Sequence, residues 1–425
     1  MAARKKRVAK KPKKIIKKPR RPKGSGLRPR ASGKKLIKKT RKPLKKKVAK
    51  KPAKTKVLKK VIRKKIAKKV VRRKVVKKIV KKKILRKKFT PLDLKRSLQN
   101  PIIQPSSQYW ESKATFNPTA FLHDGKVHII YRAIGETDNS VLGYAESPDG
   151  VKISSSFPRP VYYHFMRGAP DTKLSPISYS SGGGWGGGCE DPRVTLLGDR
   201  LYMIYTAFDG WGSVRMALTS ISLEDFMDKC WNWRDPILIS PPHEIHKNWV
   251  LFPEKINGKF AILHAISPTI MIDYVDSLDD FDGKTYLRSV HQSSPLWAAR
   301  DRLTRGVGPA PIKTKYGWLV LYHKMERHET HRYKLWAMIL DERDPTKVLY
   351  NSSQPILEPD EWYENEGYKS GVVYSCGAVV KNGQLFVYYG GADKVSCVAT
   401  ANLDLFLKEL MRHRVAKLQS KRIAT

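Results

Sequence analysis

A pattern of apolar and aromatic positions recurs five times in the C-terminal part of the chain. Each copy begins with a glycine and ends near a Tyr, His or Arg; the five copies are Gly125–Arg132, Gly198–Tyr205, Gly258–His264, Gly317–His323 and Gly383–Tyr389. A second run of the same kind follows each copy, at Leu142–Ser147, Val214–Ser220, Met271–Asp276, Tyr333–Leu340 and Val395–Ala401. Alternation with a period of two is typical of β-strands. The pattern therefore predicts five pairs of strands.

The five copies are spaced as structural repeats are. Their glycines lie 73, 60, 59 and 66 residues apart, and acidic or turn-rich stretches such as Asp279–Gly283 close most units. A unit of this length that cannot bury its own apolar face is typical of stacked or radial repetition. Because the units consist of strands, we expect an all-β, five-bladed β-propeller. The chemistry of such a fold lies on one axial face, where the blade ends converge.

Charge divides the chain into two parts. Residues 1–88 hold 46 of the 85 Lys and Arg residues and no Asp or Glu, which leaves 39 basic and 37 acidic residues in the remainder. We expect a disordered, Lys/Arg-rich N-terminal tail over 1–88, because like charge at this density keeps a chain extended. Residues 89–425 are expected to form one propeller domain with a short C-terminal helix, since a propeller of this length is a single domain.

The tail predicts binding to a polyanion without sequence specificity. Its apolar pairs are spaced alternately four and five residues apart, so they form no continuous stripe on a helix. Counterion release would favour nucleic acid, and an anionic membrane surface or an acidic polymer would satisfy the same charges. The alternative is a spacer or solubilising arm with no specific partner.

The remaining composition points to a cytoplasmic protein. The N-terminus has charge but no apolar segment of the length that a secretory signal needs, and no apolar run could span a bilayer. Four cysteines, Cys189, Cys230, Cys376 and Cys397, show no metal-binding spacing. We therefore expect reduced thiols, no metal and no transmembrane segment.

The segment Ser180–Arg193 is the strongest candidate for chemistry. Six glycines surround Trp185 and are followed by Cys189, Glu190, Asp191, Pro192 and Arg193. Glycines let a backbone approach a ligand, and a carboxylate beside an arginine can be tuned as an acid. The competing interpretation is a structural turn. A phosphate-binding P-loop is excluded because no Gly-Lys-Ser/Thr follows.

Other polar residues stand at corresponding ends of the predicted strands. They are Asn117 and Arg132 in the first unit, Lys247 and Asn248 before the third, His323 in the fourth and Asp393 in the fifth. Each alone could be a surface group at a strand end. Together, around one axis, they suit a polyhydroxylated ligand with an anion nearby.

These motifs resemble glycoside hydrolase family 130, the β-mannoside phosphorylases and related β-mannosidases. The resemblance covers about Asn100 to Leu410 and rests on these segments: Phe116–Pro118, Tyr131–Ala133, Gly188–Arg193, Leu251–Lys255, Gly308–Thr314, Gly317–Leu319, Tyr322–His323 and Tyr388–Asp393. It implies a five-bladed propeller, in agreement with the count of repeats. It also implies an inverting reaction in which inorganic phosphate is the nucleophile and no cofactor is needed.

The resemblance assigns roles to the candidate residues. Asp191 matches the general acid, which in this family acts through the mannose 3-hydroxyl, unlike the usual pair of flanking carboxylates. The predicted residues for binding the β-mannoside oligosaccharide are Asn117, Arg132, Glu190, Arg193 and Asp393. The predicted residues for binding inorganic phosphate are Lys247, Asn248, Arg305, His323 and Tyr333.

The phosphate set departs from the family pattern at two positions. A typical Arg is replaced by Ala265, and a typical Lys falls on Thr304, next to Arg305. A shift of one residue turns a side chain to the other face of a strand, although a loop could absorb it.

We therefore expect an inverting phosphorylase that releases mannose 1-phosphate. A β-mannosidase that uses water, with Glu326 or Glu329 as base, is the first alternative, and a non-catalytic glycan-binding propeller is the second. The linkage, the acceptor sugar and the oligomeric state stay open.

Overall fold

The computed structural model describes residues 90–164, 187–210 and 212–413. The predicted tail over residues 1–88 lies outside the described residues. The described part is all-β, as expected, with two short α-helices, α2 (Leu223–Met227) and α3 (Leu403–Leu410). Three 3-10 turns complete the helical elements: η2 (Leu278–Asp280), η3 (Pro295–Trp297) and η4 (Trp362–Glu364). No helix in these described ranges has the length and apolar character needed to cross a membrane.

The largest sheet combines the first two predicted units. Its strands are β2 (Ala114–His123), β3 (Lys126–Ile134), β4 (Asn139–Ser147), β5 (Ser155–Ser156), β6 (Gly187–Leu197), β7 (Arg200–Phe208), β8 (Val214–Ser222) and β9 (Ile237–Leu238). All neighbours are antiparallel except β4 and β6, which pair in parallel at only two positions. The sheet is therefore two antiparallel runs joined by a short parallel contact.

The other three units form separate antiparallel sheets. The third consists of β10 (Val250–Leu251), β11 (Phe260–Ala265) and β12 (Met271–Val275). The fourth consists of β13 (Thr304–Val307), β14 (Ile312–Thr314), β15 (Gly317–Glu326), β16 (Glu329–Leu340) and β17 (Val348–Asn351). The fifth consists of β18 (Val373–Lys381), β19 (Gln384–Gly391), β20 (Val395–Asn402) and β1 (Lys95–Arg96). The N-terminal strand β1 thus completes the sheet formed by the C-terminal strands.

The predicted strand pairs are confirmed as the second and third strands of the units. Four of the repeated glycines stand in the turns before β3, β7, β11 and β19, and the fifth, Gly317, is the first residue of β15. All five have positive φ. In the first, third and fifth units the preceding residue, Asp124, Asn257 or Asn382, is also left-handed. Two left-handed residues make the tight turn that suits the twist of a hairpin. This requirement explains why glycine recurs at this position.

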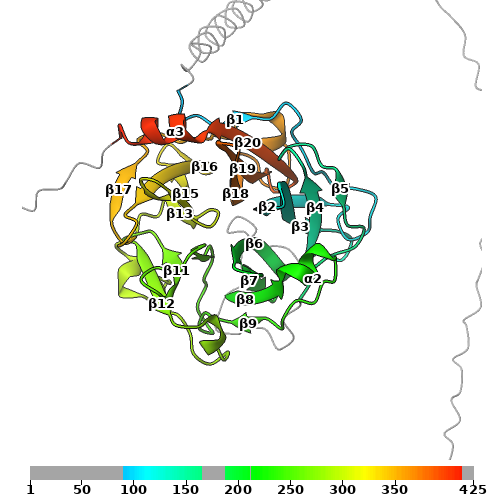
Figure 1. Ribbon diagram of the computed structural model, residues 1–425, viewed down its shortest axis with the longest axis horizontal. Helices are drawn as coiled ribbons and strands as arrows, with labels where there is room; N and C mark the ends of the chain where they lie inside the picture. Colours follow the sequence, from blue (N-terminus) through cyan, green and yellow to red (C-terminus); the bar gives the residue numbers. More distant parts are fainter. Residues whose placement is uncertain (1–89, 165–186, 211, 414–425) are drawn as a thin grey trace, which may run out of the picture. The chain divides into compact units, whose positions relative to one another are not determined.

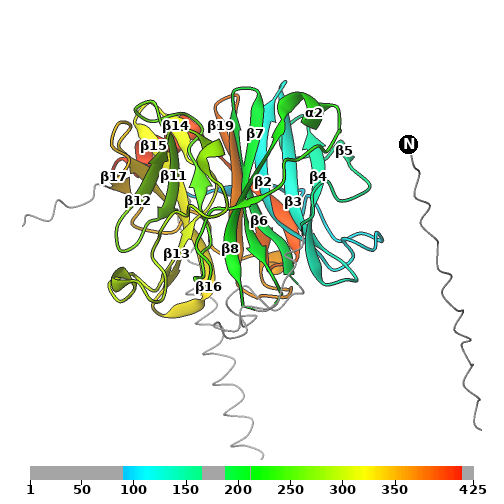
Figure 2. The ribbon, with the colours of Figure 1, turned by 90° about the horizontal axis from the view of Figure 1, so that it is seen from below.

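Apolar clusters join each unit to the next. Leu201 and Met203 of β7 pack with Ile130 and Tyr144 of the first unit. Further clusters join the second unit to the third, the third to the fourth and the fourth to the fifth. Finally, Val127 and Ile129 of β3 pack with Phe386 and Tyr388 of β19, which connects the fifth unit to the first. Figure 1 shows the units arranged around a common centre, and the side view in Figure 2 shows strands such as β6, β7 and β8 running side by side along the viewing direction of Figure 1.

Candidate active site

The innermost strands of the units carry irregularities that were not predicted. The pairing register shifts in β2 between Phe116 and Thr119, and in β6 between Glu190 and Arg193. Asn117 (φ 49°), Asp191 (φ 50°) and Asn248 (φ 67°) are left-handed at corresponding places in the first three units. A β-bulge redirects a side chain out of the regular alternation. Each of these residues accordingly lines the same central pocket.

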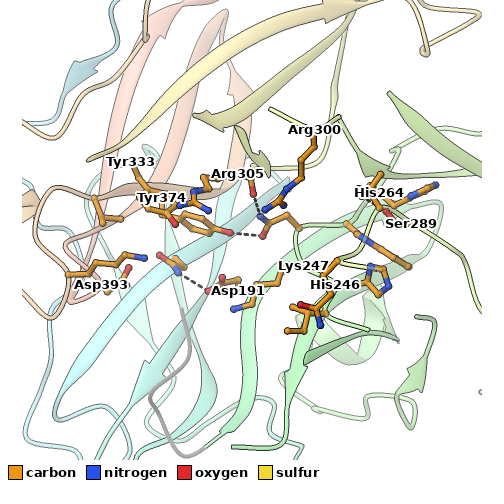
Figure 3. Close-up of a pocket in the computed structure, with 18 of the residues that line it drawn as sticks. Asp191, His246, Lys247, His264, Ser289, Arg300, Arg305, Tyr333, Tyr374 and Asp393 are labelled. Carbon is orange, nitrogen blue, oxygen red and sulfur yellow. Dashed lines mark hydrogen bonds between the residues drawn. The ribbon is translucent and has the colours of Figure 1, made fainter. Parts of the chain in front are cut away.

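The pocket has a volume of about 360 Å³, which is within the range for small-molecule sites. Figure 3 shows most of its lining side chains, which come from all five units and their loops. They are Asn117, Arg132, Asp191, Ile245, His246, Lys247, Asn248, Trp249, His264, Ser289, Val290, Gln292, Trp297, Arg300, Arg305, Tyr333, Lys369, Val372, Tyr374 and Asp393. Eleven residues were predicted to be the acid or to bind sugar or phosphate. Eight of them line this one cavity: Asn117, Arg132, Asp191, Lys247, Asn248, Arg305, Tyr333 and Asp393.

Asp191 is a buried carboxylate at the pocket wall, with 6% of its surface exposed. Its Oδ1 accepts hydrogen bonds from Asn117 Nδ2 (2.7 Å) and Arg132 Nη1 (3.2 Å). Burial is the largest influence on the Asp191 pKa and raises it, but the nearby cations, Arg132 first, outweigh burial. The pKa of Asp191 is therefore below its ordinary value, and the carboxyl is ionised when the pocket is empty.

A buried ion network supports Asp191 from one side. Arg132 Nη2 donates to Glu190 Oε1 (2.8 Å), and Lys247 Nζ lies 3.3 Å from Glu190 Oε2. Glu190 is completely buried and does not line the pocket. It therefore holds Arg132 and Lys247 in place, whereas the sequence predicted that it contacts the sugar.

Arg193 lies behind Asp191 and outside the pocket lining. Its guanidinium donates to the backbone oxygens of Asp191 (2.8 Å) and Gly308 (2.8 Å), and to Asn248 Oδ1 (2.9 Å). With 1% of its surface exposed, its donors are turned toward the protein. Arg193 therefore links the second, third and fourth units and holds the backbone of Asp191 in position. It was predicted to bind the substrate, but it does not line the cavity.

Asp393 faces the same pocket from the end of β19. Its backbone is left-handed, like that of the preceding Ala392. Removal of water from around its carboxyl is the main reason that its pKa is raised to about 6. Lys369 and Arg132 act in the opposite direction, and the neighbouring carboxylate of Asp191 adds to the increase. Two carboxyls with opposite shifts thus share one cavity.

A second wall of the pocket is formed by the amide of Asn248 and the guanidinium of Arg305. Asn248 Nδ2 donates to the Arg305 carbonyl (2.7 Å), while its Oδ1 accepts from Tyr374 (2.5 Å) and Arg193. Arg305 lies over the ring of Tyr333, with 5.4 Å between the guanidinium carbon and the ring centroid. These contacts fix the amide of Asn248 and leave the Arg305 charge facing the cavity.

The family's typical Lys falls on Thr304, and the structure shows that the adjacent Arg305 faces the pocket instead. Thr304 pairs with Lys324 and Gly306 with His323, so Arg305 is the extra residue of a β-bulge. Thr304 Oγ1 donates to Asp301 Oδ2 (3.1 Å) and is absent from the pocket lining, whereas Arg305 is part of it. The bulge therefore turns the shifted cation back toward the site.

His323 is the one predicted phosphate residue that does not line the pocket. It has no exposed surface, stacks on the Tyr374 ring with centroids 4.1 Å apart, and accepts from the Ser375 backbone N–H (2.9 Å). Burial, with the charge of Arg193, lowers its pKa to about 3. A neutral histidine behind Tyr374 positions that tyrosine and does not itself reach the pocket.

The two carboxylates considered for water activation lie outside the pocket lining. Glu326 and Glu329 both form ion pairs with the buried Lys334, which also lies 3.0 Å from Glu358. Together with His328, these two glutamates form the group of potential metal ligands found among the described residues. Because both carboxylates are paired with the Lys334 ammonium, the group is an ion-pair cluster at the end of the β15–β16 hairpin.

Sequence reasoning missed several lining residues. His264, and not its neighbour Ala265, lines the pocket from β11, where another register shift occurs. His246, Ser289, Gln292, Trp297, Arg300, Lys369 and Tyr374 were also missed. Most of them belong to loops between the predicted strands, where no periodic pattern marks a residue as facing a site.

Comparisons with known proteins agree with this geometry. The family described as β-1,4-mannooligosaccharide phosphorylase, glycoside hydrolase family 130, matches residues 76–412. A 1,2-β-oligomannan phosphorylase of Thermoanaerobacter sp. (strain X514) is 35% identical over 317 residues, which are 72% of this chain and 97% of that protein. A β-1,2-mannobiose phosphorylase of the same organism is 32% identical over 71% of this chain and 94% of its own length.

A solved structure is similar in fold. The β-1,2-mannobiose phosphorylase of Listeria innocua, in complex with β-1,2-mannobiose, has a TM-score of 0.55 and 24% identity, and the match covers 75% of this chain and 99% of that one. The fold, the pocket and the match over most of the chain lead to one conclusion. The chain belongs to glycoside hydrolase family 130.

Proposed function

We propose that this protein is an inverting β-mannoside phosphorylase that uses inorganic phosphate to release mannose 1-phosphate. The observation that carries the proposal is the division of one pocket into two walls. One wall holds the buried carboxyl of Asp191 with Asn117, and the other holds the cationic and amide groups of Arg305 and Asn248. A sugar and an anion can therefore be bound side by side, as phosphorolysis requires.

The sugar side supplies orientation and the proton. Asn117 donates to Asp191 and keeps its own buried Oδ1 without a partner among the described residues, so that oxygen can accept from a sugar hydroxyl. Arg132 and Asp393 complete this side. Asp191 gives its proton through the mannose 3-hydroxyl to the glycosidic oxygen as the bond from that oxygen to the anomeric carbon breaks.

The anion side supplies the nucleophile. Lys247, Asn248, Arg305 and Tyr333 hold phosphate so that one of its oxygens bonds to the anomeric carbon on the face opposite the leaving group. The configuration inverts, and the β-mannoside becomes an α-phosphate. Phosphate arrives as an anion, so the reaction needs no general base and no cofactor.

The protonation of Asp191 must change when substrates bind. In the empty pocket the surrounding cations keep the carboxyl ionised. A phosphate anion beside Lys247 partly neutralises that charge, and a sugar that excludes water increases the effect of burial. Both changes raise the pKa of Asp191 and favour the acid form.

We propose a β-1,2-linked mannoside as the substrate class. The two Thermoanaerobacter relatives at 35% and 32% identity are named for β-1,2-linked substrates, whereas a β-1,4-mannooligosaccharide phosphorylase of Ruminococcus albus is 29% identical. The difference in identity is small but consistent with the β-1,2 linkage.

The fold proposal is a five-bladed β-propeller over residues 89–425. It is supported by five antiparallel units, by the apolar cluster that joins the fifth unit to the first, and by β1 completing the last sheet.

Residues 1–88 form a separate basic region that binds a polyanion. We also place the protein in the cytoplasm, in keeping with four free cysteines. Deleting residues 1–88 should abolish salt-sensitive retention on heparin and leave turnover unchanged; lost turnover would show that the region belongs to the catalytic domain.

The deciding experiment is turnover of β-1,2- and β-1,4-mannobiose with and without inorganic phosphate. We expect mannose 1-phosphate from the β-1,2 substrate only when phosphate is present. Free mannose regardless of phosphate would identify a mannosidase instead.

Asp191→Asn should reduce kcat by about 100-fold to 10,000-fold, as the loss of a general acid does. Calorimetry should show that this variant still binds mannobiose. Wild-type protein that binds mannobiose without any turnover would favour the non-catalytic alternative.

A further inference from the structure

The loop between β12 and β13 brings the guanidinium of Arg300 into the pocket. Arg300 follows the 3-10 turn η3 and lines the cavity. Its Nε is buried and has no hydrogen-bond partner among the described residues, where it also forms no ion pair with a carboxylate. Buried donors of this kind are costly to leave unsatisfied, so the side chain is arranged for an acceptor that binds there.

The position of this guanidinium is fixed from one side. Its carbon lies 3.3 Å from the centroid of the Trp297 ring, a close cation–π contact. Figure 3 shows the side chains of Arg300, Arg305 and Lys247 directed into the same pocket. Arg300 therefore does not need to be ordered by the ligand, because Trp297 already holds it toward the cavity.

The charges around Arg300 are of the same sign. Burial, followed by the charges of Arg305 and Arg302, lowers the Arg300 pKa. Arg305 likewise has no ion pair with a carboxylate in the part of the chain that the structure describes, whereas Lys247 is paired with Glu190. Within the described ranges, two guanidiniums that form no ion pair with a carboxylate thus line the same pocket.

An oxyanion with several acceptor oxygens satisfies both guanidiniums at once. Guanidinium groups match phosphate through paired hydrogen bonds, and the anion removes the repulsion between them. A neutral sugar hydroxyl would accept one bond but would leave the charge uncompensated. The chemistry of this wall therefore selects an anion over a sugar.

We propose that Arg300 is a phosphate-binding residue that supplies the cation absent at Ala265. Ala265 carries no charge and its neighbour His264, held by Asp273 at 3.2 Å, lines the pocket in its place. The cation comes instead from a loop 35 residues further along the chain. This inference rests on the proposed phosphorolysis, and it identifies how that reaction retains a complete set of cations.

The test compares Arg300→Ala and Arg300→Lys with Arg302→Ala. Arg302 is an exposed arginine of the same loop that does not line the pocket, so it is the matched control. With saturating β-1,2-mannobiose, we expect Arg300→Ala to raise the KM for phosphate by about tenfold to a hundredfold, as the loss of a charge-assisted hydrogen bond does. Arg300→Lys should lie between Arg300→Ala and the wild type, and Arg302→Ala should equal the wild type.

Two further measurements distinguish a loss of phosphate binding from a loss of sugar binding or of folding. The KM for mannobiose should change by less than about twofold, because Arg300 contacts the anion and not the sugar. Phosphate should raise the melting temperature of the wild type and of Arg302→Ala, and should raise it less for Arg300→Ala. Circular dichroism would show that the variants are folded.

The results separate this inference from the proposed function. If the wild type forms mannose 1-phosphate and Arg300→Ala keeps its KM for phosphate, the inference is wrong and phosphorolysis stands. A raised KM for mannobiose with an unchanged KM for phosphate would overturn it by making Arg300 a sugar-binding residue. If the wild type forms no mannose 1-phosphate, phosphorolysis itself fails, while phosphate-dependent melting would still report whether Arg300 binds the anion.

Discussion

The placement of Asn117 depends on a glycine in another unit, and Gly390→Ala tests this dependence. Gly390 lies on β19 and faces Asn117. A Cβ at position 390 would lie 2.7 Å from the Asn117 backbone nitrogen and closer still to its Oδ1. Carbon atoms pack at about 3.5–4.0 Å, so Asn117 would have to move by about 0.8 Å or more.

The size of the effect follows from this displacement. Asn117 donates the 2.7 Å hydrogen bond to Asp191, and misplacing a catalytic group by about 1 Å costs about 100-fold. We expect kcat/KM for β-1,2-mannobiose to fall by about 100-fold, with little change in the KM for phosphate. Overpacking should also reduce the free energy of unfolding by about 1–3 kcal/mol.

The assay needs a control with a similar loss of stability. Gly383→Ala fits, because Gly383 lies in the turn before β19 with φ 73° and open space around the added carbon. An alanine forced to positive φ costs about 1–2 kcal/mol, and activity should stay at the wild-type level. Because Gly390 acts through Asn117, Asn117→Ala combined with Gly390→Ala should be no less active than Asn117→Ala alone. Wild-type kcat/KM in a folded Gly390→Ala protein would refute this reasoning.

Two further outcomes follow from the buried groups of the pocket. Asp393 should lose its charge as the pH falls through its raised pKa of about 6, so kcat/KM for the mannoside should decline below about pH 6. Asp393→Asn should remove this limb of the pH profile and lower activity above it, and an unchanged profile would contradict the role of the ionised carboxylate. Tyr374→Phe removes the donor to Asn248 Oδ1 and should raise the KM for phosphate by about twofold to tenfold, measured with saturating mannobiose. A wild-type value would show that Arg193 alone holds the Asn248 amide.

The repeat pattern was sufficient to predict the strands. Alternation is a local property, and the same glycine opens all five hairpins because the turn requires a left-handed backbone there. The motif around Asp191 also stood out locally, because a run of glycines leads directly into two adjacent carboxylates and an arginine. Residues that stand in a turn or at a strand end could therefore be recognised from the sequence.

The irregularities of the strands could not be predicted from the sequence in this way. A bulge moves one side chain to the opposite face, and the sequence of β13 does not show whether Thr304 or Arg305 faces the pocket. The register with β15 decides this in favour of Arg305. The same limit applies to His323, whose strand position suggested contact with phosphate but whose ring lies behind Tyr374.

The sequence by itself determined the paired strands of the five units and singled out Asp191 as the candidate acid. Only the tertiary structure decided which polar groups meet at the pocket: it placed Arg193 behind Asp191 and brought the loop residue Arg300 beside Arg305. Local periodicity reflects the shape of a single strand. Proximity across units depends on how the units pack and on where loops return, and no short pattern in the chain encodes that packing.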